Sequence, residues 1–553
     1  MSPWNFAAVV LWLVICASTG SSGNENHMTS HQADGPIVET KYGKVQGVFL
    51  DGAKVFYGIP FAEPPTGDNR WRNPTPPKSW SPDILQATKI PPACPQHCAL
   101  PPLMCANETS EDCLLMTVHA PLTSTHLSNL PVMAYIYGGR YIMGSGYNLL
   151  QDGRYLVNHS NIILVEFNYR IGALGFLVAG KGKDAATGNY AIHDQRLALQ
   201  WIQDNIVAFG GNPDSVTIFG QSSGAESVSI HLISEKSEHL FHRAIIESHP
   251  FALPYRVHAD AIILGNKLAK VLNCSTADMS CLRSKSYEEI LDAQEKVGGE
   301  IVNPFRLLEL FQPWGPWVGS DDVPEQPVDA FYYGLFSHKP IMIGSTSDEG
   351  RANVFLAYKK PISKSQYYET IIADFRLRAL DVLYRYPPTK LESDDQREVL
   401  SIVAHQYMFV CPEQVSARGI SKYSDTWLYV FDHAISFDAW GPNYHCCVNH
   451  PCHGSELPFI FHSPSLAGFN FTIEEESLSR SLMYYWTNFA RTGDPNNSGS
   501  ECMPLKRDGF TKWPKYDKSK NWQYLRFMTP QNVVMENYLS KECNFWDSLN
   551  YYP

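Results

Sequence analysis

The sequence predicts an α/β fold in which a mostly parallel central sheet is flanked by helices and covered by a helical cap region. Short apolar runs bounded by turn residues indicate buried strands. Segments with helical periodicity lie between them, and alternation of strand and helix is typical of a parallel sheet with helices on both faces. The predicted strands span residues 132–137, 162–169, 215–220, 243–248, 340–345 and 426–433.

The clearest helix is predicted over residues 191–209. Apolar side chains recur there every three or four positions from Ala198 to Phe209, which places them on one face, and a pair of glycines then ends the helix. Residues 250–335 and 355–420 also read as mostly helical, with loops. We expect these two segments to form the cap over the carboxyl edge of the sheet.

Composition and charge restrict the class of protein. The chain has 553 residues with 44% hydrophobic and 12% aromatic residues, which is enough to bury a large core. Its 44 Lys and Arg against 56 Asp and Glu give a formal net charge of −12, which disfavours nucleic acid as a partner. No repeat, low-complexity tract or Gly/Ser linker interrupts residues 36–550, so a single domain is expected there.

The N-terminal segment predicts secretion. Residues 6–17 are apolar, and small residues follow up to position 23. Because a membrane span needs about 20 apolar residues, this run fits a cleaved signal peptide over residues 1–23 better than an uncleaved anchor. No stable membrane span is therefore expected, and the protein is predicted to be extracellular.

Cysteines and glycosylation triplets agree with secretion. One of the thirteen cysteines, Cys16, lies in the signal segment, which leaves the even number of twelve for an oxidising compartment. Five N-glycosylation triplets also occur. Their asparagines are Asn107, Asn158, Asn273, Asn470 and Asn496.

Residues 220–224 read Gly-Gln-Ser-Ser-Gly between a predicted strand and a helical pattern. This G-x-S-x-G pattern in its strand–turn–helix context indicates a nucleophilic serine, Ser222, whereas a Ser/Gly-rich turn without chemistry is the alternative. The glycines leave room for a tight turn, because side chains there would collide with the neighbouring strand and helix. Ser223 is not the nucleophile, since the turn aims only the central residue outward, but its N–H and the helix N-terminus favour an oxyanion.

The partners of Ser222 are expected later in the chain, with an acid before a histidine. Glu349 or Asp348 follows the predicted strand at 340–345, where active-site groups collect. His453 is the preferred base because Gly454 beside it allows close approach. Three histidines compete with it locally: His445, His450 and His462.

Several segments together resemble a type-B carboxylesterase of the carboxylesterase/cholinesterase family, over about residues 36 to 546. These segments are residues 56–65, 111–114, 168–170, 188–224, 348–350, 453–454 and 488–496. The resemblance implies the α/β-hydrolase fold and ester hydrolysis without a cofactor. It also implies that Ser222 is the nucleophile, Glu349 the acid and His453 the base.

The resemblance also implies three disulfides, and Cys98 and Cys105 inside the first loop are suited to pair with each other. The implied pairs are Cys94–Cys113, Cys274–Cys281 and Cys411–Cys543. Four cysteines remain, enough for two bridges that would hold the loop carrying His453: Cys446, Cys447, Cys452 and Cys502. Because histidines lie among them, a zinc site is the alternative, but their order fits no familiar finger spacing and we expect no metal.

The chain departs from the family at the oxyanion segment, where Arg140 stands in place of the third glycine. By position, the hole is built from the N–H groups of Gly139, Arg140 and Ser223. Arginine keeps its N–H, so a left-handed backbone there costs about 1–2 kcal/mol of strain, whereas a lost donor costs about 2.7–4 kcal/mol of barrier. We therefore expect lowered rather than absent activity, unless the guanidinium fills the pocket. An acidic substrate group is an alternative partner for Arg140, although a solvated or structurally paired arginine is the usual case.

A second departure is Gln221, which replaces the glutamate that usually precedes the nucleophile and so removes a negative charge. The loop between Cys94 and Cys113 also lacks the tryptophan with which cholinesterases hold the choline ammonium. Both observations argue against a cationic substrate and against a cholinesterase.

The sequence thus predicts a secreted serine hydrolase that cleaves small-molecule or lipid carboxylic esters through an acyl-enzyme. Its oligomeric state is left open. The rival hypothesis is a catalytically weak or silent adhesion or recognition protein on the same scaffold, for which Arg140 and Gln221 argue. A lipase working at interfaces is a third hypothesis.

Overall fold

The computed structural model describes residues 35–303, 306–389, 395–499 and 509–549. The predicted signal peptide, residues 1–23, lies outside the described residues. Residues Pro36–Pro553 form one compact unit, which carries the fold described below. Within the described ranges, no helix is both long enough and apolar enough to cross a bilayer.

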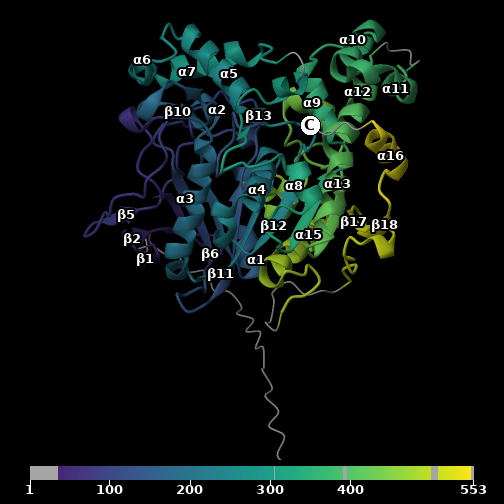
Figure 1. Ribbon diagram of the computed structural model, residues 1–553. Helices are drawn as coiled ribbons and strands as arrows, with labels where there is room; N and C mark the ends of the chain where they lie inside the picture. The colour runs from purple at the N-terminus through teal and green to yellow at the C-terminus, as the bar shows by residue number, and fades with distance from the viewer. Residues whose placement is uncertain (1–34, 304–305, 390–394, 500–508, 550–553) are drawn as a thin grey trace, which may run out of the picture. The chain divides into compact units, whose positions relative to one another are not determined.

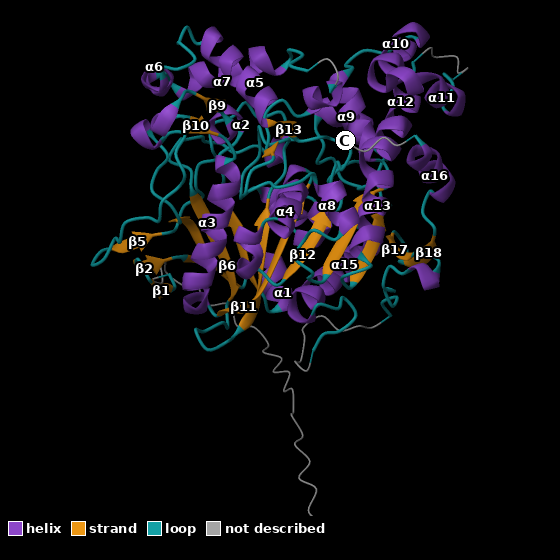
Figure 2. Ribbon diagram, viewed as in Figure 1, coloured by secondary structure: helices purple, strands orange, loops and turns teal. Residues whose placement is uncertain are grey.

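A large central sheet organises this unit, and among the described residues it has eleven strands. In spatial order they are β18 (Val533–Glu536), β17 (Gln523–Phe527), β16 (Thr426–Phe431), β15 (Ile341–Thr346), β12 (Arg243–Glu247), β11 (Gly211–Gln221), β7 (Leu130–Ile136), β8 (Ile163–Phe167), β6 (Leu115–Pro121), β4 (Ala53–Pro60) and β3 (Val48–Leu50). From β17 to β8 all neighbours are parallel, and the strands at both edges are antiparallel. The predicted α/β fold with a mostly parallel sheet is confirmed (Figure 2).

All six predicted strands are present, as β7, β8, β11, β12, β15 and β16. They were recognisable because a strand buried on both faces carries a continuous apolar run. The edge strands were missed because polar or charged residues interrupt them, such as Lys54 in β4, His119 in β6 and Arg526 in β17.

Helices cover both faces of the sheet. Those that pack on strands are α1 (Arg154–Ser160), α3 (Tyr190–Asn205), α4 (Ser223–Ile233), α13 (Cys411–Ile420) and α15 (Ile473–Thr492). Glu247 on β12 accepts a hydrogen bond from Trp486 of α15 at 2.7 Å. In the neighbouring strand β15, Gly344 is the partner of Glu247 and so faces the same side of the sheet. The next residue of β15, Ser345, faces the other side and donates a hydrogen bond to Glu413 of α13. Since successive residues of a strand point to opposite faces, α15 and α13 lie on opposite sides.

The helix predicted over residues 191–209 is confirmed. It is the α-helix α3, Tyr190–Asn205, continued by a 3₁₀ turn over Ile206–Phe209. Gly210 ends it with φ 95°, a left-handed conformation that favours glycine.

The predicted cap is present but smaller than expected. Its helices are α5 (His258–Val271), α6 (Met279–Ser284), α7 (Tyr287–Gly298), α10 (Lys364–Phe375), α11 (Ala379–Arg385) and α12 (Arg397–Ala404). In Figure 1 they lie at the top of the view, beyond the carboxyl ends of the parallel strands. Two helices of the predicted cap segments flank the sheet instead, because α13 packs on β15 and β16 and α8 (Pro327–Tyr333) packs on α4.

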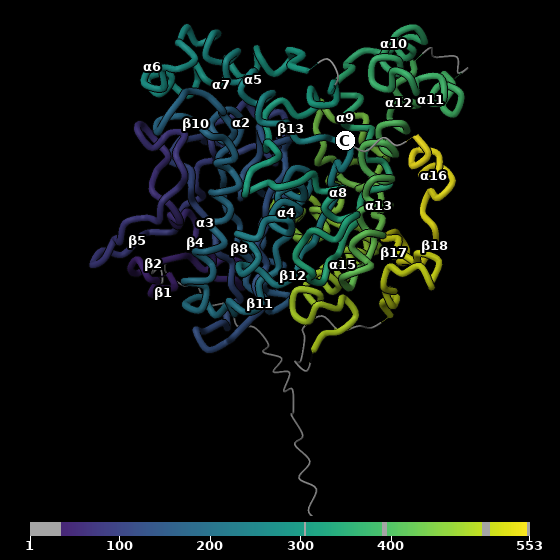
Figure 3. The backbone as a smooth tube through the Cα atoms, in the orientation of Figure 1, coloured from purple at the N-terminus to yellow at the C-terminus, as the bar shows by residue number. Residues whose placement is uncertain are grey.

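The C-terminal helix α16 (Ser540–Ser548) lies beside α13, although more than a hundred residues separate them (Figure 3). The disulfide Cys411–Cys543 joins the two helices. Trp546 of α16 is fully buried and packs against Tyr386 and Tyr407. These aromatic residues belong to a second, smaller hydrophobic core, which packs the C-terminal helix against the residues that precede α13.

Candidate active site

Ser222 occupies the turn between β11, which ends at Gln221, and α4, which begins at Ser223. Its backbone has φ 60° and ψ −126°, a sparsely populated conformation for a residue with a side chain. The N–H of Ser222 donates to the carbonyl of Glu247 at 2.9 Å, which holds the turn against β12. The residue is half-buried and lines a cavity of about 1320 Å³.

Glycines make this turn sterically feasible. A Cβ atom on Gly224 would lie 1.9 Å from the carbonyl oxygen of Ile136, and one on Gly220 would lie 2.5 Å from the same atom. A Cβ atom on Gly138 would lie 2.3 Å from the carbonyl oxygen of Gln221. Both glycines of the motif therefore pack against the last residue of β7, Ile136, and a side chain at either position would collide with its carbonyl oxygen.

Glu349 is the first residue of α9 (Glu349–Ala357), three positions beyond the end of β15. It is fully buried. One carboxylate oxygen accepts from the hydroxyl of Ser248 and from the N–H of Thr346, each at 2.6 Å, and the other accepts from Nδ1 of His453. Burial alone would raise the pKa of Glu349, but the charge of His453 and these hydrogen bonds lower it below its usual value. Sequence reasoning missed Ser248, whose place directly after β12 is the signal that could have found it.

His453 is oriented by this carboxylate. Because Nδ1 donates to Glu349, the neutral ring keeps its lone pair on Nε2, where a base acting on Ser222 needs it. Burial lowers the pKa of His453, but the negative charge of Glu349 outweighs burial, so the pKa is raised above its usual value. Ser222 and His453 line the same cavity, so the structure brings the three predicted residues into one site.

The lone pair of His453 has a different partner in this structure. The amide Nε2 of Gln221 lies 3.1 Å from Nε2 of His453 and donates to it. Within the described residues, no hydrogen bond joins the hydroxyl of Ser222 to the imidazole. The residue that replaces the family's glutamate therefore contacts the proposed base directly, which the sequence separation of 232 positions concealed.

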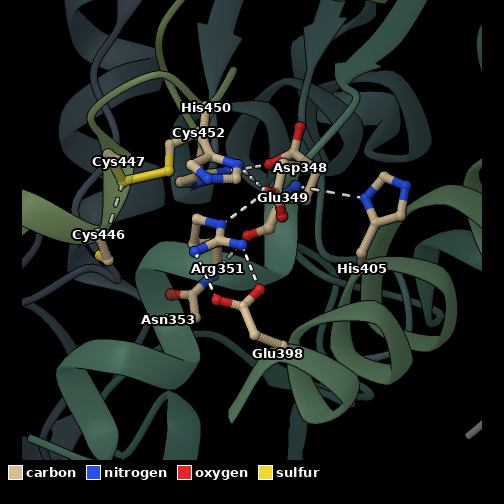
Figure 4. The surroundings of a disulfide bond; sticks show 11 residues. Asp348, Glu349, Arg351, Asn353, Glu398, His405, Cys446, Cys447, His450 and Cys452 are labelled. Carbon is tan, nitrogen blue, oxygen red and sulfur yellow. Dashed lines mark hydrogen bonds and ion pairs between the residues drawn. A yellow bond between two sulfur atoms is a disulfide. The ribbon is translucent and has the colours of Figure 1, made fainter. Parts of the chain in front are cut away.

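The competing acid, Asp348, points to other partners (Figure 4). Its Oδ2 accepts from Nε of Arg351 at 2.8 Å and lies 3.1 Å from Nδ1 of His450. Arg351 also pairs with Glu398 of α12. Asp348 and His450 thus belong to an ion-pair network beside the site, and His453 is bonded to Glu349 instead.

The two other histidines of this region also lie apart from Glu349. His462 bonds the hydroxyl of Ser479 through Nδ1 at 2.7 Å. His445 is exposed and lines the cavity. Neither contacts the Glu349 carboxylate, so the geometry selects His453 among the four.

Two residues of the predicted oxyanion hole, Gly139 and Arg140, line the cavity. Gly139 has φ 125° and Arg140 has φ 59°, so both adopt positive φ. Their N–H groups, and that of Ser223 at the start of α4, donate to no acceptor among the described residues. The hydroxyl of Ser223 accepts from the N–H of Tyr141 at 3.2 Å, which ties the loop to the nucleophile turn. Three unpaired donors beside Ser222 are the arrangement that an oxyanion requires.

Arg140 does not close the cavity. Its Nε donates to the carbonyl of Phe311 at 2.8 Å, which holds the side chain against the wall. A cavity of about 1320 Å³ remains, lined by the strand-end loops and by the cap. Most of the cap side of the lining is apolar or aromatic, including Leu308, Phe375 and Tyr407. Among the described residues, no cluster of His, Cys, Asp and Glu has the geometry of a metal site.

Disulfides hold the loops around this cavity. The structure contains the three implied pairs together with Cys98–Cys105. Cys447 pairs with Cys452, the residue before His453, and Cys446 is the free cysteine of the described chain. Because the sulfurs of Cys447 and Cys452 are joined in this disulfide, neither can serve as a thiolate ligand for zinc. Cys502, the fourth cysteine of the predicted set, lies outside the described residues.

Four of the five predicted glycosylation asparagines are exposed: Asn107, Asn158, Asn273 and Asn470. Asn496 is half-buried and its amide is engaged. Nδ2 donates to Asp494 and to the carbonyl of Trp513, and Oδ1 accepts from the N–H of Trp513. A glycan on Asn496 would have to break these bonds, so this asparagine is the least suited of the five.

Known proteins match the chain over most of its length. The model of the carboxylesterase family matches residues 34–546. The acetylcholinesterase of Bungarus fasciatus is 35% identical over 92% of this chain and 86% of its own. The cAMP-regulated D2 protein of Dictyostelium discoideum is 36% identical over 84% and 85%, respectively. The solved structure of a thermophilic PNB esterase superposes with a TM-score of 0.78 at 30% identity, covering 92% of this chain and 99% of that one. The α/β-hydrolase fold is thus shown, and the chain belongs to the carboxylesterase family.

Proposed function

We propose that the protein is a secreted serine hydrolase that cleaves carboxylic esters through an acyl-enzyme intermediate. The observation that carries this proposal is the geometry around Ser222. A carboxylate with a lowered pKa orients the imidazole of His453, and the imidazole shares a cavity with Ser222 and with unpaired backbone N–H groups. Membership of the carboxylesterase family supports ester hydrolysis.

In the first half-reaction, the Ser222 hydroxyl attacks the ester carbonyl carbon while its proton moves to Nε2 of His453. The carbonyl oxygen becomes an oxyanion, which the N–H groups of Gly139, Arg140 and Ser223 stabilise. The imidazolium then protonates the leaving oxygen, the alcohol departs and the acyl-enzyme remains. Water that is deprotonated by the same imidazole attacks the acyl carbon, and the proton returns to the serine as the acid leaves.

Glu349 stabilises the imidazolium that forms in both halves of the cycle. Gln221 imposes a condition on the first step. Its amide donates to the lone pair of His453 that must accept the serine proton. This amide therefore has to turn away before Ser222 reacts, which agrees with lowered activity as the sequence predicts.

The cavity supports a small-molecule or lipid ester with a sizeable apolar part. Its volume of about 1320 Å³ is above the range of about 300–1,000 Å³ that is usual for ligand pockets. Secretion is supported by the five disulfides of the described chain, since such bonds persist in oxidising compartments.

Hydrolysis of a para-nitrophenyl ester tests the proposal. The wild-type protein is expected to release para-nitrophenolate, and Ser222→Ala is expected to lower kcat by about 10⁶-fold. Ser223→Ala is the matched control, because Ser223 keeps its backbone N–H and is not the nucleophile. Equal turnover by wild type and Ser222→Ala would refute the proposal.

A recognition protein without activity is the second candidate function. Two observations favour it: the amide of Gln221 donates to Nε2 of His453, and Arg140, with positive φ, lies in the oxyanion segment. A fluorophosphonate probe separates the two functions. Covalent capture of Ser222 supports the hydrolase, whereas a folded protein that captures no probe supports recognition.

A further inference from the structure

Arg140 differs from Arg397, the other arginine that lines the cavity, in the charge of its partner, because Arg397 pairs with Asp395. Its one hydrogen bond runs from Nε to the neutral carbonyl of Phe311, and no carboxylate among the described residues contacts the guanidinium. Deeply buried arginines elsewhere are paired with acids: Arg70 with Glu111, Arg170 with Asp194 and Arg256 with Glu309. Arg140 is exposed and lines the cavity, so its guanidinium can bind a ligand without first losing such a partner.

The geometry of Arg140 leaves a usable fork. The bond from Nε to Phe311 fixes the direction of the side chain, while the N–H groups on both Nη atoms donate to no acceptor in the described chain. Arg140 lines the same cavity as Ser222 and His453. The planar fork matches a carboxylate, which accepts two parallel hydrogen bonds from it.

The surroundings of Arg140 favour an anion. Gln221 contributes a neutral amide where a glutamate would add negative charge, and the carboxylate of Glu349 is fully buried behind His453. The N-terminus of α4, an eleven-residue helix, adds its positive end at Ser223.

The two acidic residues that line the cavity, Glu369 and Asp374, belong to α10 in the cap. Neither forms an ion pair or hydrogen bond with Arg140. The negative charges that line the cavity are therefore in the cap, and neither of them neutralises Arg140.

We propose that Arg140 binds a carboxylate of the substrate, so that the site selects carboxylic esters with a second, anionic carboxylate group. The inference rests on the proposed ester hydrolysis and names its substrate class. Arg140 then has two roles: its backbone N–H faces the oxyanion, and its guanidinium determines specificity.

Matched pairs of esters test the proposal. On the acyl side, the para-nitrophenyl hemiester of glutaric acid is compared with para-nitrophenyl pentanoate. On the alcohol side, para-acetoxybenzoate is compared with its methyl ester. In the wild-type protein, kcat/KM for the anionic member of one pair is expected to exceed that of the neutral member by about 10- to 100-fold, the effect of a charge-assisted hydrogen bond.

Arg140→Gln keeps the backbone N–H and much of the side-chain length, and it is expected to reduce that preference to within about twofold. Arg140→Lys keeps the positive charge but not the planar pair of donors, and it is expected to retain part of the preference for the anionic ester. Each preference is a ratio within one variant, so a change in overall rate does not affect it. Absence of a preference in the wild type, or an unchanged preference in Arg140→Gln, would overturn the proposal.

Binding separates this inference from the proposed function. Calorimetry measures the affinity of the glutaric hemiester and of para-acetoxybenzoate for Ser222→Ala and for Ser222→Ala combined with Arg140→Gln. The second substitution is expected to weaken binding of at least one anion by about 10- to 100-fold. If the wild type hydrolyses no ester but this loss is seen, the hydrolase proposal fails and the anion site stands. If both variants bind both anions equally, the anion site is refuted whatever the activity.

Discussion

Replacing Gln221 by glutamate should move the activity of this protein to higher pH. Gln221 donates its amide N–H to the lone pair of His453 across 3.1 Å, which favours the neutral imidazole. A carboxylate in the same place can only accept, and it would favour the protonated ring. The variant therefore converts a contact that keeps the base neutral into one that keeps it charged.

The magnitude follows from the distance. Two unit charges 3.1 Å apart attract by about 1.3 kcal/mol even with the dielectric constant of bulk water, and more strongly in a partly buried site. Since about 1.4 kcal/mol corresponds to one pH unit, the acid limb of the kcat/KM profile should move up by at least about one pH unit. The base must be neutral to accept the serine proton, so activity at pH 6–7 should fall while activity at high pH is retained.

The assay is the pH dependence of kcat/KM for a neutral para-nitrophenyl ester, measured on wild type and Gln221→Glu. Gln151→Glu is the matched control: it places the same new carboxylate on the cavity wall at a residue whose amide oxygen already accepts, from Asn148. The control should shift the acid limb much less. An acid limb that stays in place in Gln221→Glu, or moves to lower pH, would refute the contact between Gln221 and His453.

Three further substitutions probe the site and the fold. Glu349→Gln cannot balance the imidazolium charge and should lower kcat by about 10⁴-fold with little change in KM, whereas a fall below tenfold would contradict its role. Gly224→Ala would place a Cβ 1.9 Å from the carbonyl of Ile136 and should destabilise the protein by about 1–3 kcal/mol, seen as a lower Tm, while Gly299→Ala meets open space and should not. Burial raises the pKa of Glu247 to about 8, so the folded state favours the protonated carboxyl, and this contribution to stability is lost as the pH rises through that value. Glu247→Gln removes the ionisable group, so Tm should fall less between about pH 5 and pH 9 than in the wild type. An equal fall of Tm in both proteins would refute this.

Local patterns were sufficient for the centre of the fold. β15 and β16 were recognisable because both faces are buried, and α3 because its apolar stripe ends at a left-handed Gly210. The boundary of the cap could not be read in the same way. α8 and α13 have helical sequences like those of the cap, and only their packing on α4 and on the sheet distinguishes them.

In the candidate site, too, local sequence patterns identified some residues, whereas others could be assigned only from contacts in space. The strand–turn–helix context identified Ser222, but Asp348 and Glu349 are adjacent and equally acidic, and the choice depends on which carboxylate meets His453 in space. The contacts that adjust the chemistry join distant positions. Gln221 reaches His453 across 232 residues, and Arg140 reaches Phe311 across 171, so neither contact leaves a pattern in the sequence.

Covalent labelling shows whether Ser222 is an activated nucleophile. The folded wild-type protein is treated with a fluorophosphonate, and the modified peptide is identified by mass spectrometry. We expect one adduct, on Ser222, that forms much more slowly in His453→Gln. No adduct on the folded protein, an adduct on Ser223, or equal labelling rates with and without the imidazole would contradict it.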